Sequence, residues 1–245
     1  MDHRTDYFAG LASHPAFVNH LPMRKLLIVG AFLAAGMQFA AADDLAPLPL
    51  VLPPPAMKGT PQALPTNTTA LPLTSDLRPP FLAPKGVVNV ALGKPVSASD
   101  SNLFNGELRQ ITDGKKESFP ENVVTLRKGL RWVQIDLQSE YKIYAVVIWH
   151  DFEVPRVYRD VIVQLSDDPE FKTGVETIFN NDQKNTAAMG AGTDREYFEN
   201  SLTAAGKLID AKGIKARYIR CYSKGSTENA LNSYIEVEAY GLPAS

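Results

Sequence analysis

The sequence predicts an all-β fold, a β-sandwich, for the region from residue 88 to residue 245. Short runs rich in β-branched and aromatic residues alternate there with clusters of turn-forming residues. Helical periodicity is weak, and the best helix candidate is one turn near residues 201–207. Regularly spaced short strands joined by turns favour two packed antiparallel sheets. A chain of this length can bury a sufficient core without disulfides.

Five runs are expected to form the main strands. Residues 132–137 (WVQIDL) alternate between apolar and polar side chains, as in a strand with one buried face. Residues 144–149 (YAVVIW) are apolar on both faces, which is expected of a central strand. Residues 160–166 (DVIVQLS) alternate again and lead into a turn, and residues 216–223 and 234–241 supply two further strands.

The composition argues against several classes of function. The formal net charge is −2, so no electrostatic footprint for nucleic acid is indicated. The sequence contains no Gly-rich phosphate loop, no dinucleotide fingerprint and no G-x-S-x-G elbow. With 245 residues and a hydrophobic content of 44%, the chain is expected to form one or two globular domains.

Residues 23–42 have the pattern of a secretory signal peptide. A basic pair follows Met23, residues 26–37 are apolar but too few to span a bilayer comfortably, and the small residues 40–42 form a cleavage site. We therefore expect a mature protein that begins at Asp43, without a transmembrane anchor, and that is secreted, periplasmic or at the cell surface. The alternatives are a membrane anchor or a buried helix.

Residues 1–22 lack this pattern, and we expect them to be an extension upstream of a true start at Met23. Three of the four histidines precede Met23, so the mature chain keeps only His150, together with the single Cys221. These counts exclude an intramolecular disulfide and a zinc site rich in His or Cys. Cys221 lies in a strand-like run and is expected to be a small buried hydrophobe rather than a nucleophile.

Residues 43–87 are dense in proline and poor in aromatic residues. Proline removes backbone donors and favours extended polyproline conformations. We therefore expect this segment to be a semi-rigid or disordered tether in front of the sandwich domain at residues 88–245.

Six motifs occur in an order that is typical of one known family. NVALGKPVSAS (89–99) opens the domain and ITDGKKES (111–118) follows it; RWVQIDLQSEYKIYAVVIW, YRDVIVQLSDDPEF, ARYIRCYS and YIEVEAYG come next. Together they resemble the coagulation factor 5/8 type C, or discoidin, domain, whose bacterial relatives include family 32 carbohydrate-binding modules. The resemblance covers residues 88–241 and implies a jelly-roll β-sandwich of the galactose-binding type.

The resemblance also implies a structural calcium site that joins the first loop to the last strand. The family pattern falls on the carbonyls of Gln110, Lys115 and Ile235, the carboxylates of Asp113 and Glu236, and the hydroxyl or carbonyl of Ser118. Calcium takes about six to eight hard oxygen ligands, most of which this set supplies.

The residues themselves add one reason to expect a cation there. Glu236 and Glu238 lie on the same face of a strand that otherwise has the composition of a packed one, and a partly buried carboxylate needs a partner. The alternative is a plain turn with Glu236 in a salt bridge. Lys115 and Lys116 depart from the family pattern, and their side chains are expected to point to water.

A ligand site is expected in WHDFEVPR, residues 149–156, where a hydrophobic strand runs into polar and aromatic residues. Sugar recognition needs an aromatic platform and planar side chains that bind paired hydroxyls. Trp149 or Phe152 would stack, and His150, Asp151 and Arg156 would hydrogen-bond. The alternatives are a core tryptophan, a structural histidine and a solvated loop with local ion pairs. Two long polar loops, 180–200 and 223–234, are further candidates for a binding face.

These observations favour an exported, non-catalytic module that binds carbohydrate, such as a cell-surface glycan. The alternative is a structural or protein–protein interaction domain of the same fold, without a sugar site. An enzyme is disfavoured because the mature chain has one histidine, no paired carboxylates at a recognisable spacing and no cofactor motif. The loops are mostly polar, which disfavours a lipid-binding surface.

Overall fold

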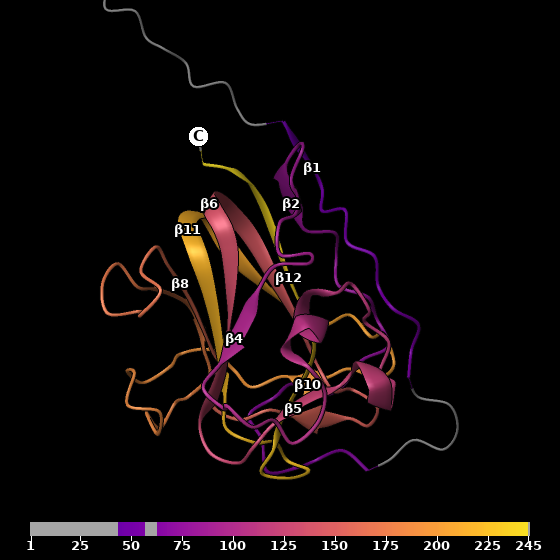
Figure 1. Ribbon diagram of the computed structural model, residues 1–245. Helices are drawn as coiled ribbons and strands as arrows, with labels where there is room; N and C mark the ends of the chain where they lie inside the picture. Colours follow the sequence, from indigo (N-terminus) through magenta and orange to yellow (C-terminus); the bar gives the residue numbers. More distant parts are fainter. Residues whose placement is uncertain (1–43, 57–62, 245) are drawn as a thin grey trace, which may run out of the picture. The chain divides into compact units, whose positions relative to one another are not determined.

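The computed structural model describes residues 44–56 and 63–244, to which all structural statements below refer. These residues form mostly antiparallel β-structure (Figure 1), with two short 3-10 helices, η1 (Leu108–Thr112) and η2 (Pro120–Asn122). The all-β prediction is confirmed, and the helix candidate near 201–207 is a turn that leads into a strand. None of the helices described is long and apolar enough to cross a membrane. The predicted signal peptide (23–42) and upstream extension (1–22) lie outside the described residues.

The strands are β1 (Leu45–Pro47), β2 (Leu82–Pro84), β3 (Val88–Asn89), β4 (Val96–Ala98), β5 (Val124–Leu126), β6 (Arg131–His150), β7 (Arg156–Val157), β8 (Ile162–Ser166), β9 (Glu176–Asn180), β10 (Phe198–Glu199), β11 (Lys207–Ser223) and β12 (Asn232–Pro243).

The two longest strands, β6 and β11, belong to both layers of a sandwich. Residues 131–136 of β6 lie between β4 and the second half of β11, whereas residues 141–150 lie between β12 and the first half of β11. The pairing of β6 with β11 shifts register between these halves, and Figure 1 shows both strands turning over at the top of the view. Bulges and bends are how a strand passes from one sheet to the other.

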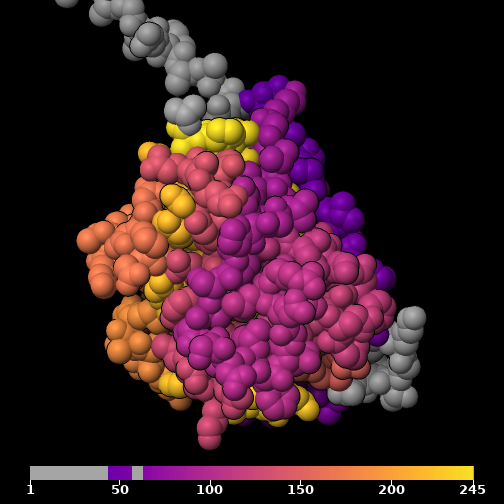
Figure 2. Space-filling model, in the orientation of Figure 1, coloured from indigo at the N-terminus to yellow at the C-terminus, as the bar shows by residue number. Residues whose placement is uncertain are grey.

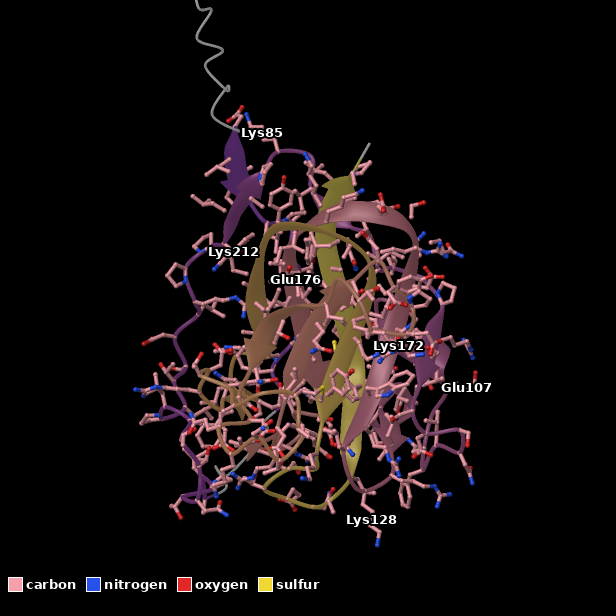
Figure 3. All side chains as sticks on the ribbon, turned by 90° about the vertical axis from the view of Figure 1, so that its left-hand side faces the viewer. Lys85, Glu107, Lys128, Lys172, Glu176 and Lys212 are labelled. Carbon is pink, nitrogen blue, oxygen red and sulfur yellow. The ribbon has the colours of Figure 1, made fainter. Side chains whose placement is uncertain are left out.

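One layer therefore contains β4, β8 and β9 together with the first half of β6 and the second half of β11. The other layer contains β3, β5 and β12 together with the second half of β6 and the first half of β11. The jelly-roll β-sandwich expected from the sequence is confirmed. Because β6 turns over near Gln138, its first and last residues lie at the same end of the sandwich. The loop before β6 and the loop after it lie at this end as well. Figure 3 shows Lys128 at this end and Lys85 at the opposite one.

The main core fills the space between the layers. Val133 and Ile135 from the first half of β6 face Val146 and Ile148 from its second half in one buried cluster. Cys221 belongs to the same cluster and is buried, and burial raises the pKa of its thiol to about 12. The interpretation of Cys221 as a small hydrophobe is confirmed, because a buried thiol with a raised pKa is a poor nucleophile.

A second apolar cluster lies on the outer face of β6 and β12. Ala145, Val147 and Trp149 point to this face and are fully buried. They are covered by the proline-rich segment, which contributes seven apolar side chains to the cluster: Leu48, Leu50, Leu52, Ala56, Phe81, Ala83 and Val87. We call the described part of this segment, residues 44–56 and 63–87, the strap; it runs in indigo to purple along the right-hand side of Figures 1 and 2.

The strap is fastened by polar contacts as well as by its leucines. β1 pairs with β2 inside the strap, Arg78 donates a hydrogen bond to the carbonyl of Gly206 (2.8 Å), and Asn200 donates one to the carbonyl of Thr74 (2.9 Å). The sequence predicts a semi-rigid or disordered tether here. The described residues pack against the sheet instead, because alternating Leu and Pro supply apolar surface that the outer face of β6 can bury.

Candidate functional site

A cavity of about 260 Å³ opens among the loops at the Lys128 end of the sandwich. Its walls come from four separate segments of the chain, so the fold itself assembles it. The lining residues are Phe104, Asn105, Ser118, Phe119, Pro120, Val123, Thr125, Asp151, Glu153, Arg156, Asn229, Leu231 and Ser233. The volume lies just under the range typical of drug-sized ligands and suits a smaller molecule.

Two phenylalanines on the cavity wall are unusually exposed. Phe104 is 67% exposed and Phe119 is 53% exposed, in a domain whose other aromatic residues are mostly in the core. Pro120 follows Phe119 and restricts it to an extended backbone (φ −105°, ψ 146°). Exposed aromatic rings beside a cavity are a means of holding the apolar face of a ligand.

Phe104 is positioned by the pairing of its loop with β5. The amide of Phe104 donates to the carbonyl of Thr125 (2.8 Å), and Asn105 forms an isolated bridge with Thr125. Gly106 allows the close approach, because it adopts φ +79° and a Cβ there would lie 2.7 Å from the carbonyl oxygen of Val123.

A charged pair supplies the polar side of the cavity. Nη1 of Arg156 lies 3.0 Å from Oδ2 of Asp151, and the hydroxyl of Ser118 donates to Oδ1 of Asp151 (2.9 Å). The Nε–H of Arg156 is buried and has no hydrogen-bond partner among the described residues. A carboxylate and a guanidinium held side by side offer acceptors and donors in fixed directions, which is what paired hydroxyl groups require.

The structure divides the five predicted ligand residues into two groups. Asp151 and Arg156 line the cavity, as predicted. Trp149, His150 and Phe152 are fully buried beneath it, so none of them can contact a ligand in this conformation, and this part of the prediction is wrong. Trp149 and Phe152 are buried because the outer face of β6 is covered by the strap and by the loop that precedes β11. His150 points the other way, into the main core, where its ring packs against Tyr158 and Tyr234.

The buried residues have structural partners instead. The indole Nε1–H of Trp149 donates to the carbonyl of Ala204 (2.9 Å). Nδ1 of His150 lies 2.8 Å from Oε1 of Glu199, and its ring stacks on Tyr158 with centroids 4.2 Å apart. Burial raises the pKa of Glu199, although His150 acts in the opposite direction. This cluster therefore belongs to the interior of the domain.

Sequence reasoning missed the two exposed phenylalanines. Both lie in turn-rich segments, NLFNG and SFPEN, outside any run with a strand period. An isolated aromatic residue among turn-forming residues does not belong to the apolar face of a strand. This pattern in the sequence predicts an exposed aromatic side chain.

Glu236, one of the predicted calcium ligands, contacts the loop that carries Asp113. Its carboxylate is completely buried, and both oxygens lie 3.2 Å from the amide of Gly114, the residue after Asp113. Burial, and then the carboxylates of Glu238 and Asp113, raise the pKa of Glu236 to about 9. No basic side chain forms a salt bridge with it among the described residues, so the alternative of a simple ion pair at Glu236 is not supported.

The backbone near Glu236 also suits a cation. The pairing of β12 with β6 skips a position between Tyr234 and Glu236, which places a bulge at Ile235. A bulged residue is released from the regular ladder. The carbonyl of Gln110 meets only a long 3.5 Å contact from the amide of Asp113. Ser118 fits less well, since its hydroxyl is already bonded to Asp151.

Carboxylate and carbonyl oxygens are the ligands that calcium takes, and the half-buried Asp113, the buried Glu236 and the weakly bonded carbonyl of Gln110 fit that requirement. In the described part of the chain no three His, Cys, Asp or Glu side chains cluster as a metal site. A site built from two carboxylates and several backbone carbonyls does not need such a cluster.

Lys116 differs from the expectation that it points to water. Its ammonium is buried against Oε1 of Glu238 (2.8 Å), donates to the carbonyl of Val51 in the strap, and lies 5.0 Å from the centre of the Trp149 ring. A buried carboxylate attracts the nearest cation. Lys115 is exposed, as expected.

No model of a known protein family matches the chain, and no curated protein matches it. Solved structures do resemble it, and they include carbohydrate-binding modules. The CBM32 of AlyQ, solved with 4,5-unsaturated mannuronic acid, is 19% identical, with a TM-score of 0.43, over 59% of this chain and 92% of that one.

Two further neighbours have the same character. Chitosan-binding module 1 of a chitosanase/glucanase from Paenibacillus sp. IK-5 is 20% identical, with a TM-score of 0.44, over 63% of this chain and 99% of that one. A Streptococcus pneumoniae fucose binding module, SpX-3, is 18% identical, with a TM-score of 0.43, over 62% and 97%. These neighbours are modules of the kind that the sequence resemblance named, and the fold assignment rests on the strand order itself.

Proposed function

We propose that this protein is a non-catalytic carbohydrate-binding module whose sugar site is the cavity between Phe104, Phe119 and Arg156. The observation that supports this most is the pairing of two exposed aromatic rings with a buried, partly unsatisfied guanidinium across one small cavity. Sugars carry an apolar C–H face and a set of hydroxyl groups, and this cavity offers a surface for each.

In this proposal the two kinds of contact have separate tasks. Phe119, with Phe104, covers the apolar face of one sugar ring. The free Nε–H of Arg156 donates a hydrogen bond to a hydroxyl oxygen, and the carboxylate of Asp151 accepts a hydrogen bond from a hydroxyl group. Glu153 and Asn229 line the same cavity and are available for further hydroxyls. No step of bond making or breaking is assigned to any residue.

The test is a glycan array with the mature chain, followed by calorimetric titration of the best ligand. Phe119→Ala and Arg156→Lys are the informative variants. Phe119 is exposed, so its removal spares the core. We expect binding to weaken about two- to tenfold, because an aromatic contact contributes about 0.5–1.5 kcal/mol. Arg156→Lys keeps the charge beside Asp151 but loses the planar fork, so it should also weaken binding.

Leu45→Ala is the matched control, because Leu45 is also 53% exposed but lies in β1, away from the cavity. Binding that survives both cavity variants would place the sugar elsewhere. A correctly folded protein that binds no glycan would favour a protein-interaction role.

We also propose that a calcium ion stabilises the domain next to this site. The carboxylates of Asp113 and Glu236 and the carbonyls of Gln110, Lys115 and Ile235 would hold it, with Ser118 supplying its hydroxyl or carbonyl. The buried, unpaired carboxylate of Glu236 is the supporting observation. Bound there, the ion supplies positive charge to the loop and to the last strand, a structural task rather than a chemical one.

Export of the module is a further proposal, which rests on the sequence of residues 23–42 alone. Sequencing the N-terminus of the protein recovered outside the cytoplasm tests it. A first residue at Asp43 supports cleavage after Ala42 and a start at Met23, whereas a mature protein that begins before Met23 contradicts both.

A further inference from the structure

A second, larger cavity lies on another part of the surface and shares no residue with the first. Its volume is about 750 Å³, within the range of ligand sites. It lies between the strap and the loops that follow β7, β9 and β11. Its lining residues are Asn67, Thr68, Thr69, Arg159, Asp160, Asn181, Gln183, Lys184, Thr186, Glu196 and Lys224.

Every lining side chain is polar, and none is aromatic. A ligand there has no ring on which to stack its apolar face. It must be held by hydrogen bonds and by charge, which restricts the cavity to hydrophilic molecules with many polar groups.

The charges in the cavity do not balance. Three cations and two carboxylates line it. Arg159 is paired with Glu196 (2.7 Å), and Lys224 lies 3.8 Å from Asp160. Lys184 is exposed and forms no salt bridge with the described residues. One positive charge is therefore left for a ligand, at a point where solvent can reach it.

Asn181, which also lines the cavity, has a buried side-chain donor without an acceptor among the described residues. Its side chain is only 4% exposed, and its Oδ1 accepts the amide of Val161 (2.7 Å), which fixes the orientation of the amide group. The Nδ2 group is buried and has no hydrogen-bond partner among the described residues. A buried donor without an acceptor is costly, and a ligand oxygen in the cavity would remove that cost.

The other side of the cavity is held rigidly. Glu196 accepts hydrogen bonds from the hydroxyl of Thr68 (2.7 Å) and the amide of Thr69 (2.8 Å), and Nη2 of Arg159 donates to the carbonyl of Asn67 (3.0 Å). The strap thus forms a fixed wall, and fixed polar groups bind a ligand with less loss of conformational entropy.

We propose that this cavity is a second binding site, specific for an acidic saccharide, with a sugar carboxylate bound at Lys184 and a ring or hydroxyl oxygen accepting from Nδ2 of Asn181. The side-chain oxygen of Gln183, on the same cavity wall, is available to accept from a further hydroxyl. The site does not rest on the sugar role of the first cavity, because the two have no lining residue in common.

The test uses the mature chain and two probes with the same sugar backbone: α-1,4-linked trigalacturonate, which is charged, and its methyl ester, which is neutral. Titration is followed by NMR at the side-chain amide of Asn181 and by calorimetry. We expect the acid to shift the Asn181 signal and to bind about tenfold more tightly than the ester, equivalent to about 1.4 kcal/mol. Raising the salt concentration should reduce this difference.

Lys184→Gln should remove most of the preference for the acid, and Lys184→Arg should retain it. Lys128→Gln is the matched control, since Lys128 is also exposed and lines neither cavity. All of these side chains are on the surface, so the fold is not at risk.

Phe119→Ala separates this proposal from the sugar site in the first cavity. Here we expect it to leave the Asn181 shift unchanged, whether or not neutral glycans bind to the protein. Equal affinities for acid and ester, or acid binding that is lost in Phe119→Ala but kept in Lys184→Gln, would overturn the second site.

Discussion

Lys116 and Glu238 form a buried ion pair at the contact between the strap and the sheet, with Nζ 2.8 Å from Oε1. The second oxygen of Glu238 accepts a hydrogen bond from the hydroxyl of Tyr240 (2.8 Å), so this carboxylate is fully partnered. Glu236, two residues earlier and also buried, has only the amide of Gly114. Of the two buried glutamates, Glu238 therefore has a lysine as its cation, whereas Glu236 has none among the described residues.

The first prediction concerns that ion pair. Lys116→Met leaves the carboxylate of Glu238 buried without its cation, and removing one partner of a buried pair costs about 3–5 kcal/mol. Denaturant unfolding should show this loss, and Lys115→Met, at the exposed neighbouring position, should leave stability almost unchanged. Restoring stability with a second substitution, Glu238→Leu, would identify the charge rather than the side-chain volume as the cause.

The second prediction concerns calcium. Ion binding to the folded state alone adds about 2.7 kcal/mol at a concentration of one hundred times Kd. For a domain of this size that should raise Tm by about 5–10 °C. Glu236→Gln retains an acceptor for the amide of Gly114 but lacks the charge, so its Tm should not respond to calcium. An identical midpoint for the unmodified protein with calcium and with chelator would argue against the ion.

The sequence predicted the sandwich well because its strands have clear periods. Residues 132–137 alternate, and their apolar side chains do face the core. Residues 144–149 are apolar on both faces, which predicts a central strand. That prediction is correct for β6. Its second apolar face is covered by a proline-rich segment some sixty residues or more upstream, and the pattern of the strand cannot show which segment covers it.

The candidate sites were harder to predict because they depend on which face is covered. Once the strap packs on the outer face, Trp149 and Phe152 become core residues, and the exposed aromatic residues beside the cavity are Phe104 and Phe119, which lie in turns. The orientation of Lys116 follows from the same contact, since it bonds to a strap carbonyl. Local patterns do not encode such long-range contacts.

The third prediction tests the strap directly. A chain that begins at residue 88 exposes the outer face of β6, including Trp149. Full exposure of one large apolar side chain costs about 1.5–3 kcal/mol, so losing the whole cover should destabilise the domain by more than that. Tryptophan emission should shift to the red compared with the chain that begins at Asp43.

The half-buried Trp132 also emits, so the comparison should be repeated with Trp132→Phe in both chains. An unshifted spectrum and an unchanged midpoint in the shortened chain would show that the strap is dispensable.

The fourth prediction concerns the acid sensitivity of the strap contact at Glu196. Burial by itself would raise the pKa of this carboxyl, but hydrogen bonds from Thr69 and Thr68 and the charge of Arg159 outweigh it and lower the pKa below its ordinary value of 4.5. A lowered pKa means that the contact contributes its full stability above pH 4.5 and loses it as the pH falls through the lower, folded-state value. The amide of Thr69, which donates to Glu196, should therefore keep its NMR shift from pH 7 to about pH 5 and change only in more acidic solution. Glu196→Gln should give a Thr69 shift that does not vary in that range. A midpoint above 4.5 in the unmodified protein would mean that burial, not hydrogen bonding, controls this carboxyl.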